Sequence, residues 1–116
     1  MTLREQRSLF ARLLPRLLDY IHDQGYHVTI GEIVRSPEQA KANSAAGKGI
    51  ANSLHLVGLA VDLNLFNAGG KYLTDTRDHK FSGDYWKSLH TLARWGGDFS
   101  PNPDGNHYSL EWQGRK

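Results

Sequence analysis

An acidic residue interrupts the most regular apolar stretch of the chain, residues 59–66, which read LAVDLNLF. The leucines and the valine recur at a period of two, which predicts a strand that carries them on one face. Asp62 then lies on the opposite face. An ionised carboxylate in so apolar a setting costs free energy unless it is paired or bound to a metal ion. The fold therefore has to supply Asp62 with a partner.

The rest of the chain alternates between helical and extended patterns. Apolar residues at three- and four-residue spacing predict a helix over residues 3–23, with Thr2 as its N-cap and Gly25 as its stop. Pro15 lies inside this pattern and is expected either to kink the helix or to divide it. The other expected elements are a strand at 26–34, a helix at 37–46, a helix at 84–95 and a strand at 107–112.

This order of elements predicts an α+β fold. We expect a small single domain over residues 1–116, with a short, partly antiparallel sheet flanked by about three helices. The chain is 39% hydrophobic and 22% charged, which is typical of a soluble globular protein.

Composition narrows the possible chemistry. The chain has no cysteine, so any metal ion must be held by histidine or by carboxylate side chains. The net charge is +2, but lysine and arginine are scattered, and we expect no nucleic-acid partner. No apolar run is long enough to span a membrane, and the charged N-terminal segment lacks the features of a signal peptide, so we expect no membrane insertion.

Two histidines can meet Asp62 if the strands at 59–66 and 107–112 are neighbours. Gly58 allows a turn that brings His55 back over the strand end, and His107 begins the last strand. Two imidazoles and one carboxylate, with a fourth position left to water, are typical of a catalytic zinc site. Asp104, three residues before His107, would then lie beside the metal ion as a general base.

Spacing alone leaves simpler interpretations open. A single histidine is more often a surface or hydrogen-bonded residue than a metal ligand. A backbone amide or an arginine could satisfy Asp62, and Asp104 is an ordinary turn residue in a Pro-Asp-Gly sequence.

Two motifs carry a family resemblance. SLHLVGLAVDL, residues 53–63, resembles the S-x-H-x-x-G-x-A-x-D signature of the zinc D-Ala-D-Ala carboxypeptidase and L-alanyl-D-glutamate peptidase family. DGNH, residues 104–107, resembles the second signature of that family, followed here by Tyr108 where phenylalanine is commoner. WGGDF, residues 95–99, is similar to the segment that precedes the second signature in phage members.

The resemblance implies roles for particular residues. His55, Asp62 and His107 would bind Zn²⁺, and Asp104 would act as the catalytic base. Arg35 matches an arginine that steadies the carbonyl or carboxylate of the substrate, so it is expected to be both catalytic and substrate-binding. Ser53 matches a serine of the first signature and is expected to contact the substrate.

The implied activity is hydrolysis of the stem peptide of peptidoglycan, at the L-alanyl-D-glutamate bond, by a phage-type endolysin. Such an enzyme would act as a monomer, accumulate in the host cytoplasm without a signal peptide, and reach the periplasm and cell wall after release. The alternatives are a D-Ala-D-Ala carboxypeptidase or dipeptidase and a non-catalytic zinc-containing module that binds the cell wall. A purely structural zinc site fits less well, because such sites usually have four protein ligands.

Residues outside the motifs receive simpler interpretations. His79 lies in the long loop after residue 66, where it could line a cleft, although we expect an exposed side chain. Glu111 shares a strand face with His107 and could hold an imidazole in place. His22 and His27 are expected to be structural or exposed.

Overall fold

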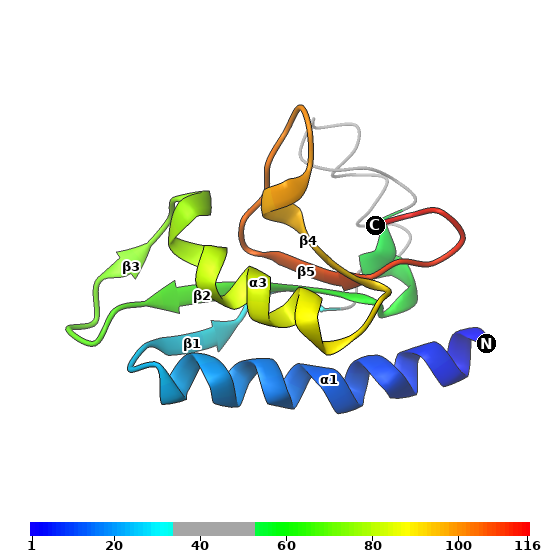
Figure 1. The fold of residues 1–116 in the computed structure, drawn as a ribbon, viewed down its shortest axis with the longest axis horizontal. Coiled ribbons are helices and arrows are strands. Elements are labelled where there is room, and N and C mark those ends of the chain that lie inside the picture. Colours follow the sequence, from blue (N-terminus) through cyan, green and yellow to red (C-terminus); the bar gives the residue numbers. More distant parts are fainter. Residues whose placement is uncertain (34–52) are drawn as a thin grey trace.

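The structure, a computed structural model, describes residues 1–33 and 53–116 (Figure 1). A long helix, α1 (Leu3–Asp23), runs beside an antiparallel sheet, and a shorter helix, α3 (Lys80–Leu89), packs against the same sheet. The expected α+β class is confirmed. The expected helix at 37–46 lies outside the described residues.

Among the described residues the sheet has five strands, and β2 and β5 form its central pair. The strands are β1 (His27–Ile30), β2 (Ala60–Phe66), β3 (Tyr72–Leu73), β4 (Ala93–Trp95) and β5 (His107–Leu110). Their order is β1-β2-β5-β4, with β3 also paired to β2, and every pairing among the described residues is antiparallel. Short 3₁₀ turns connect some of these elements: η1 (Leu54–Val57), η2 (Thr76–His79) and η3 (Gly96–Asp98).

Helix α1 begins and ends as the sequence predicts. The Thr2 hydroxyl accepts a hydrogen bond from the Glu5 amide (3.1 Å), and the Glu5 carboxylate accepts one from the Thr2 amide (2.9 Å). These reciprocal bonds satisfy amides that the first helical turn leaves without partners. Pro15 does not divide the helix, which continues to Asp23; the proline lies on the exposed side.

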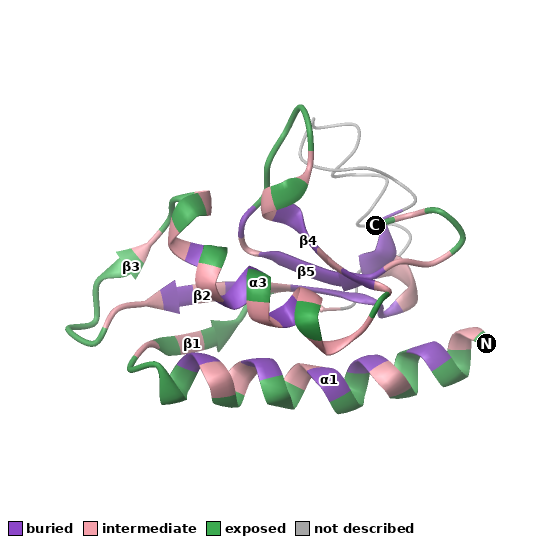
Figure 2. Ribbon diagram, in the orientation of Figure 1, coloured by how far each residue is buried: buried purple, intermediate pink, exposed green. Residues whose placement is uncertain are grey.

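The helices cover one face of the sheet. Phe10 of α1 meets Trp86 of α3 edge to face (5.7 Å between ring centroids), and Trp86 meets Tyr108 of β5 in the same manner (6.5 Å). Val61 of β2 is paired with Tyr108 and is fully buried with it. Strands β2 and β5 therefore form the centre of the core, as their buried stretches in Figure 2 show.

The predicted helix at 84–95 is wrong at both ends. Helix α3 covers Lys80–Leu89, and the residues after it turn back and form β4, which pairs with β5. The turn is closed by the Leu92 amide, which donates to His90 Nδ1 (3.0 Å), and by the Ala93 amide, which donates to the His90 carbonyl (3.1 Å). The apolar spacing of 85–93 fits a helix. The backbone of 93–95 instead forms hydrogen bonds with β5, a strand that is distant in sequence and that local spacing does not reveal.

Strand β1 is shorter than expected, and the predicted loop after residue 66 contains regular structure. The predicted strand at 26–34 is regular only as β1, although Gly31 donates to the Asp62 carbonyl (2.8 Å) and Asp62 donates to the Glu32 carbonyl (2.8 Å). These two bonds extend the pairing as far as the middle of β2. The predicted loop from 67 to 83 contains β3, η2 and the first turn of α3.

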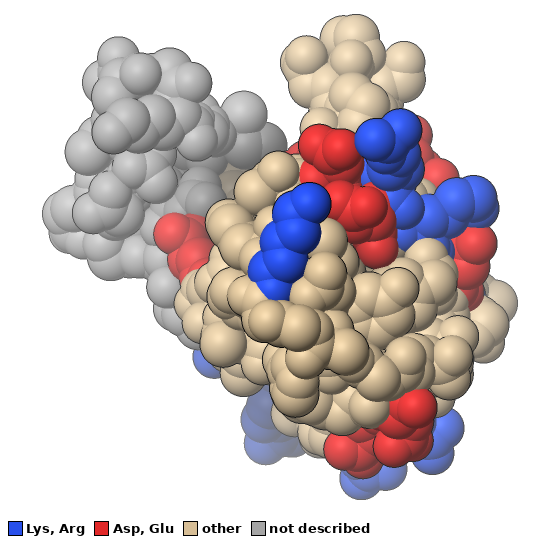
Figure 3. All heavy atoms as spheres, turned by 90° about the vertical axis from the view of Figure 1, so that its left-hand side faces the viewer, with Lys and Arg blue, Asp and Glu red and all other residues tan. Residues whose placement is uncertain are grey.

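Charges are mixed on the surface rather than separated. On the face drawn in Figure 3, acidic and basic side chains lie close to one another. Ion pairs of this kind join Lys80 to Asp84 (2.8 Å) and Lys87 to Asp98 (2.7 Å). Neither described helix combines the length and the apolar character that crossing a membrane would require.

Candidate metal centre

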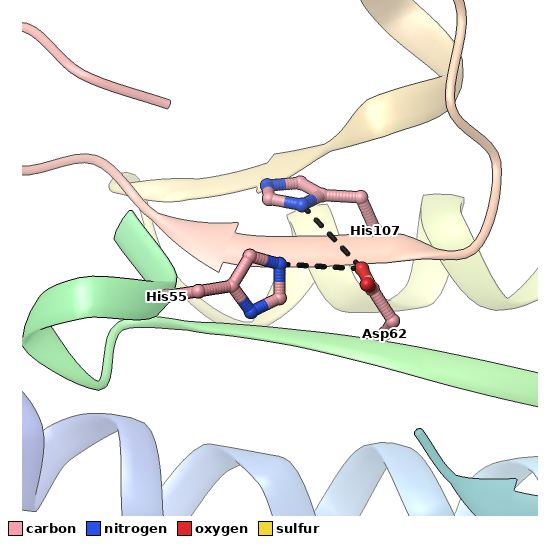
Figure 4. A group of neighbouring side chains, drawn as sticks. All are labelled: His55, Asp62 and His107. Atoms are coloured by element: carbon pink, nitrogen blue, oxygen red, sulfur yellow. Dashed lines mark ion pairs between the residues drawn. The ribbon is translucent and has the colours of Figure 1, made fainter. Parts of the chain in front are cut away.

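The sheet register brings two of the expected ligands together. Asp62 of β2 and His107 of β5 are directly paired residues, so their side chains share the face of the sheet opposite the helices. His55 reaches the same place from η1, and Figure 4 shows both imidazoles directed at the Asp62 carboxylate. The three residues offer ligand atoms that all lie within 4.8 Å of one another.

A short capped turn places His55. The Ser53 hydroxyl accepts a hydrogen bond from the His55 amide (3.2 Å) and so caps η1. Gly58 ends the turn with φ of 72°, a left-handed conformation that glycine adopts without strain. The chain then enters β2 directly, so that His55 lies over the start of the strand that carries Asp62.

The other side of the His55 ring is held by the segment after β1. His55 Nδ1 lies 3.3 Å from the Ile33 carbonyl and 3.6 Å from Glu32 Oε1, while Nε2 lies 3.4 Å from Asp62 Oδ1. A proton on Nδ1 can be donated to the carbonyl, which leaves the Nε2 lone pair directed at the centre. Sequence reasoning missed Glu32 and Ile33 in this role. The position of both residues directly after β1 was the sequence feature that could have indicated a contact with the site.

Electrostatics keep the central carboxylate ionised. Burial disfavours its charge, but the neighbouring imidazoles of His107 and His55 outweigh burial and hold the pKa of Asp62 far below its usual range. Burial also disfavours protonation of His55, yet the neighbouring carboxylates of Asp62 and Glu32 raise the pKa of His55.

The group fits a divalent metal ion. Asp62 Oδ1 and His107 Nε2 are buried and have no hydrogen-bond partner among residues 1–33 and 53–116. Buried polar atoms without partners are costly, and binding to a cation would remove that cost. Two imidazoles and one carboxylate without sulfur are a ligand set that zinc accepts, and they leave further coordination positions to solvent or substrate.

Asp104 lies beside this group and is not part of it. Its backbone carbonyl accepts a hydrogen bond from the His107 amide (3.1 Å), so the loop turns directly into β5. The surrounding protein partly desolvates the Asp104 carboxyl and Asp62 repels its charge; both effects raise the pKa of Asp104. Its side chain is exposed at the edge of a cavity of about 240 Å³ that Thr76, His79 and Asn106 also line.

Two neighbouring elements hold the loop that carries Asp104. Trp95 at the end of β4 donates from its indole Nε1 to the Gly105 carbonyl (2.7 Å). On the other side, the Gly105 amide donates to the Thr76 hydroxyl of η2 (3.2 Å). The loop is therefore fixed from both sides next to the position of the expected base.

The segment after Trp95 fits closely around the site. The Gly96 carbonyl accepts a hydrogen bond from the Asp104 amide (2.8 Å). A Cβ atom at Gly96 would overlap the Asp104 carbonyl and lie 2.8 Å from the His107 Cβ. Phe99 packs on the His107 ring, with 5.4 Å between ring centroids. WGGDF thus supports both Asp104 and His107.

Residues 46–110, more than half of the chain, match the D-alanyl-D-alanine carboxypeptidase family. The chain belongs to this family. The expected family is confirmed, and the match covers both signature motifs.

A curated relative and two solved structures are similar to this family member. The L-alanyl-D-glutamate peptidase of Listeria phage A118 is 33% identical over 104 residues, which cover 85% of this chain and 36% of the relative. The chain therefore spans about a third of the length of that relative.

The solved structures share the fold. The Serratia marcescens L-Ala D-Glu endopeptidase ChiX has a TM-score of 0.75 at 21% identity, covering 88% of this chain and 77% of its own. The vancomycin-resistance D,D-pentapeptidase VanY in complex with Zn(II), from a VanB-type cassette, has a TM-score of 0.57 at 18% identity, covering 87% and 70%.

Two interpretations of residues near the family motifs are wrong. His79 is 3% exposed rather than solvated, and its Nδ1 lies 2.9 Å from the Tyr108 hydroxyl. Glu111 does not hold an imidazole; its carboxylate accepts a hydrogen bond from Arg94 Nε (3.1 Å).

The remaining expectations have different outcomes. Arg35 lies outside the described residues. Ser53 is buried and positions His55, and a contact between Ser53 and substrate stays a prediction. His22 and His27 are exposed, in agreement with the sequence interpretation.

Proposed function

We propose that this chain is a zinc-dependent peptidase that hydrolyses the stem peptide of bacterial peptidoglycan at the L-alanyl-D-glutamate bond. The observation that carries the proposal is the convergence of His55, Asp62 and His107 from three separate elements, with Asp104 beside them. The family membership supports a peptidase, and the printed activities of the phage relative and of ChiX favour this bond.

His55, Asp62 and His107 would hold the ion. Zinc bound there would supply Lewis-acid activation of a water molecule and of the carbonyl that is attacked. The protein's own contribution is the fixed ligand geometry: Ser53 and Ile33 orient His55, and the strand register orients the other two.

Asp104 is the group that moves the proton. Its carboxylate accepts a proton from the attacking water and later donates it to the amine that leaves. A raised pKa makes this carboxylate a better proton acceptor than an ordinary aspartate. Arg35 is proposed to steady the carbonyl oxygen of the substrate, and the Ser53 hydroxyl proton could be donated to the substrate.

A second candidate is removal of a terminal D-alanine. The description of the matched family and the fold shared with VanY favour this reaction. A non-catalytic wall-binding module is less consistent with an acidic side chain at the rim of the metal centre, because such a module has no use for a base.

The biological setting belongs to the same proposal. We propose a monomer without nucleic-acid partners or membrane insertion, released from the host cytoplasm to act on the cell wall. The mixed surface charge supports the absence of a nucleic-acid partner.

Digestion of purified peptidoglycan tests the reaction. The expected products carry new D-glutamate amino ends and new L-alanine carboxyl ends, whereas release of free D-alanine would support the second candidate. The Asp104→Asn variant should keep its fold and its zinc but lose roughly 10²- to 10⁴-fold in turnover. Full activity of this variant would rule out Asp104 as the base.

A further inference from the structure

A second cavity begins near the metal centre and shares no lining residue with the cavity beside Asp104. It has a volume of about 500 Å³, and its lining includes Arg94, Phe99, Ser100 and Lys116. Phe99 also packs on the His107 ring, so the cavity begins one side chain away from the candidate metal ligands.

Strand pairing puts Arg94 on the same face of the sheet as the metal centre. Arg94 of β4 is paired with Ser109 of β5, and Ser109 lies two residues after His107. Residues two apart in a strand point to the same face. Arg94 therefore projects from the face that also carries Asp62 and His107.

Hydrogen bonds from Nε and Nη1 hold the Arg94 guanidinium in one orientation and leave Nη2 available to a ligand. Its Nε donates to Glu111 (3.1 Å), and its Nη1 donates to the carbonyls of Thr91 (2.8 Å) and Ala93 (3.0 Å). Within the described part of the chain, Nη2 makes no hydrogen bond. A fixed guanidinium loses little conformational entropy when it binds a carboxylate, which favours recognition.

The two cavities beside the metal centre differ in charge. The larger one contains Arg94, Lys116 and the acid Asp98. Arg94 is paired with Glu111 at 3.1 Å and Asp98 with Lys87 at 2.7 Å, so Lys116 gives this cavity its excess positive charge. The smaller one is lined by no lysine or arginine, and its acid is Asp104. A substrate carboxylate is therefore attracted to the larger cavity and repelled from the smaller one.

We infer that the larger cavity binds the free carboxylate of the acidic residue on one side of the cleaved bond, with Arg94 as a specificity-determining donor. This inference rests on the proposed function. In a peptide cleaved between L-alanine and a D-glutamate linked through its side chain, the glutamate α-carboxylate is this group. The α-carboxylate of the D-glutamyl residue then lies against Phe99 and Arg94, while its amine, which Asp104 protonates as the bond breaks, stays at the metal centre.

Kinetics with two matched peptides test the inference on the zinc-loaded protein. The probes are L-alanyl-γ-D-glutamyl-L-lysine and the same peptide with its α-carboxylate converted to an amide. The wild type should show a KM about tenfold lower for the acid, as expected for one charge-assisted hydrogen bond. Equal KM values for acid and amide would overturn the inference without any variant.

Substitutions assign the preference to Arg94. Arg94→Gln should raise the KM for the acid about tenfold with little change in kcat, and should leave the amide unaffected. Arg77→Gln is the matched control, because Arg77 is 85% exposed and lines neither cavity. Preserved acid preference in a folded Arg94→Gln protein would contradict the role of Arg94. If that protein does not fold, Lys116→Gln tests the charge of the cavity and should lower the acid preference.

A binding measurement separates this inference from the proposed function. The product-like dipeptide γ-D-glutamyl-L-lysine, titrated into the zinc-loaded wild type, should shift the NMR signals of Arg94 Nε and of the Trp95 indole, and its α-amide should not. If neither peptide is cleaved but these shifts occur, the peptidase proposal fails and the carboxylate site stands. Absence of the shifts refutes the carboxylate site, whatever the activity.

Discussion

Asp62 on β2 and His107 on β5 are directly opposed across the sheet, and Asp62 Oδ1 lies 3.7 Å from His107 Nδ1. This relationship depends on register, because a slip of one residue would turn one of the two side chains toward the helices. Backbone bonds on both sides of β2 fix the register: Asp62 donates to Glu32 (2.8 Å) and Leu63 donates to Asn106 (2.9 Å). Two of the three candidate ligands are therefore placed by the sheet, and only His55 comes from a turn.

Replacement of Gly96 should damage both stability and activity. Because a methyl group at this position would overlap the Asp104 carbonyl and crowd His107, Gly96→Ala should destabilise the protein by roughly 1–3 kcal/mol and displace the base. Urea denaturation and peptide hydrolysis measure the two effects. Gly69→Ala is the control, since a Cβ there makes only an ordinary 3.5 Å contact with Asn67. Equal stability of the two variants would contradict the close fit at Gly96.

The hydroxyl of Tyr108 should matter, although phenylalanine is the commoner residue after the second motif. The hydroxyl lies 2.9 Å from His79 Nδ1 and 2.7 Å from the Ser82 hydroxyl, and all three residues are buried. Tyr108→Phe leaves the imidazole without this partner, so the free energy of unfolding should fall by about 1–3 kcal/mol. The exposed Tyr72→Phe should change it by less than about 0.5 kcal/mol. A Tyr108→Phe protein as stable as the wild type would show that the network is not stabilising.

Stability should decrease in mild acid because of His79. Burial lowers the pKa of His79, and the nearby charge of Asp78 offsets this only in part. In the unfolded chain the pKa of a histidine is about 6.5, so the unfolded chain binds the proton more readily than the folded protein does. The stabilisation that neutral His79 contributes is complete above about pH 6.5. It is lost as the pH falls through the lower pKa that His79 has in the folded protein. The stability advantage of wild type over His79→Gln, measured in urea, should shrink from pH 8 to pH 5. An advantage that is constant with pH would contradict this.

Local patterns predicted the elements whose signals are local. The N-cap at Thr2, the apolar stripe and the stop at Gly25 predicted the bounds of α1, and the alternation around Asp62 predicted which face of β2 is buried under the helices. The sequence predicted the convergence of His55, Asp62 and His107 on the condition that the two strands are neighbours, and the family resemblance, rather than spacing, identified the three residues as metal ligands.

Features that depend on distant partners were not accessible in the same way. Residues 93–95 fit a helical pattern and become a strand only because β5 lies beside them. Glu111 was expected near an imidazole, but its carboxylate binds Arg94 of β4. The carboxylate that lies near His55 is that of Glu32. His79 is buried beside the hydroxyl of Tyr108, a partner 29 residues away that no local pattern contains.

Zinc content per chain is the most direct test of the metal centre. The purified wild type and Asp104→Asn should each bind about one zinc ion per chain, and zinc should raise the melting temperature of both, because an ion that binds only the folded state stabilises it. His55→Ala and His107→Ala should lose the ion and this stabilisation. One tightly bound zinc ion in either histidine variant, or none in the wild type, would contradict the proposed site.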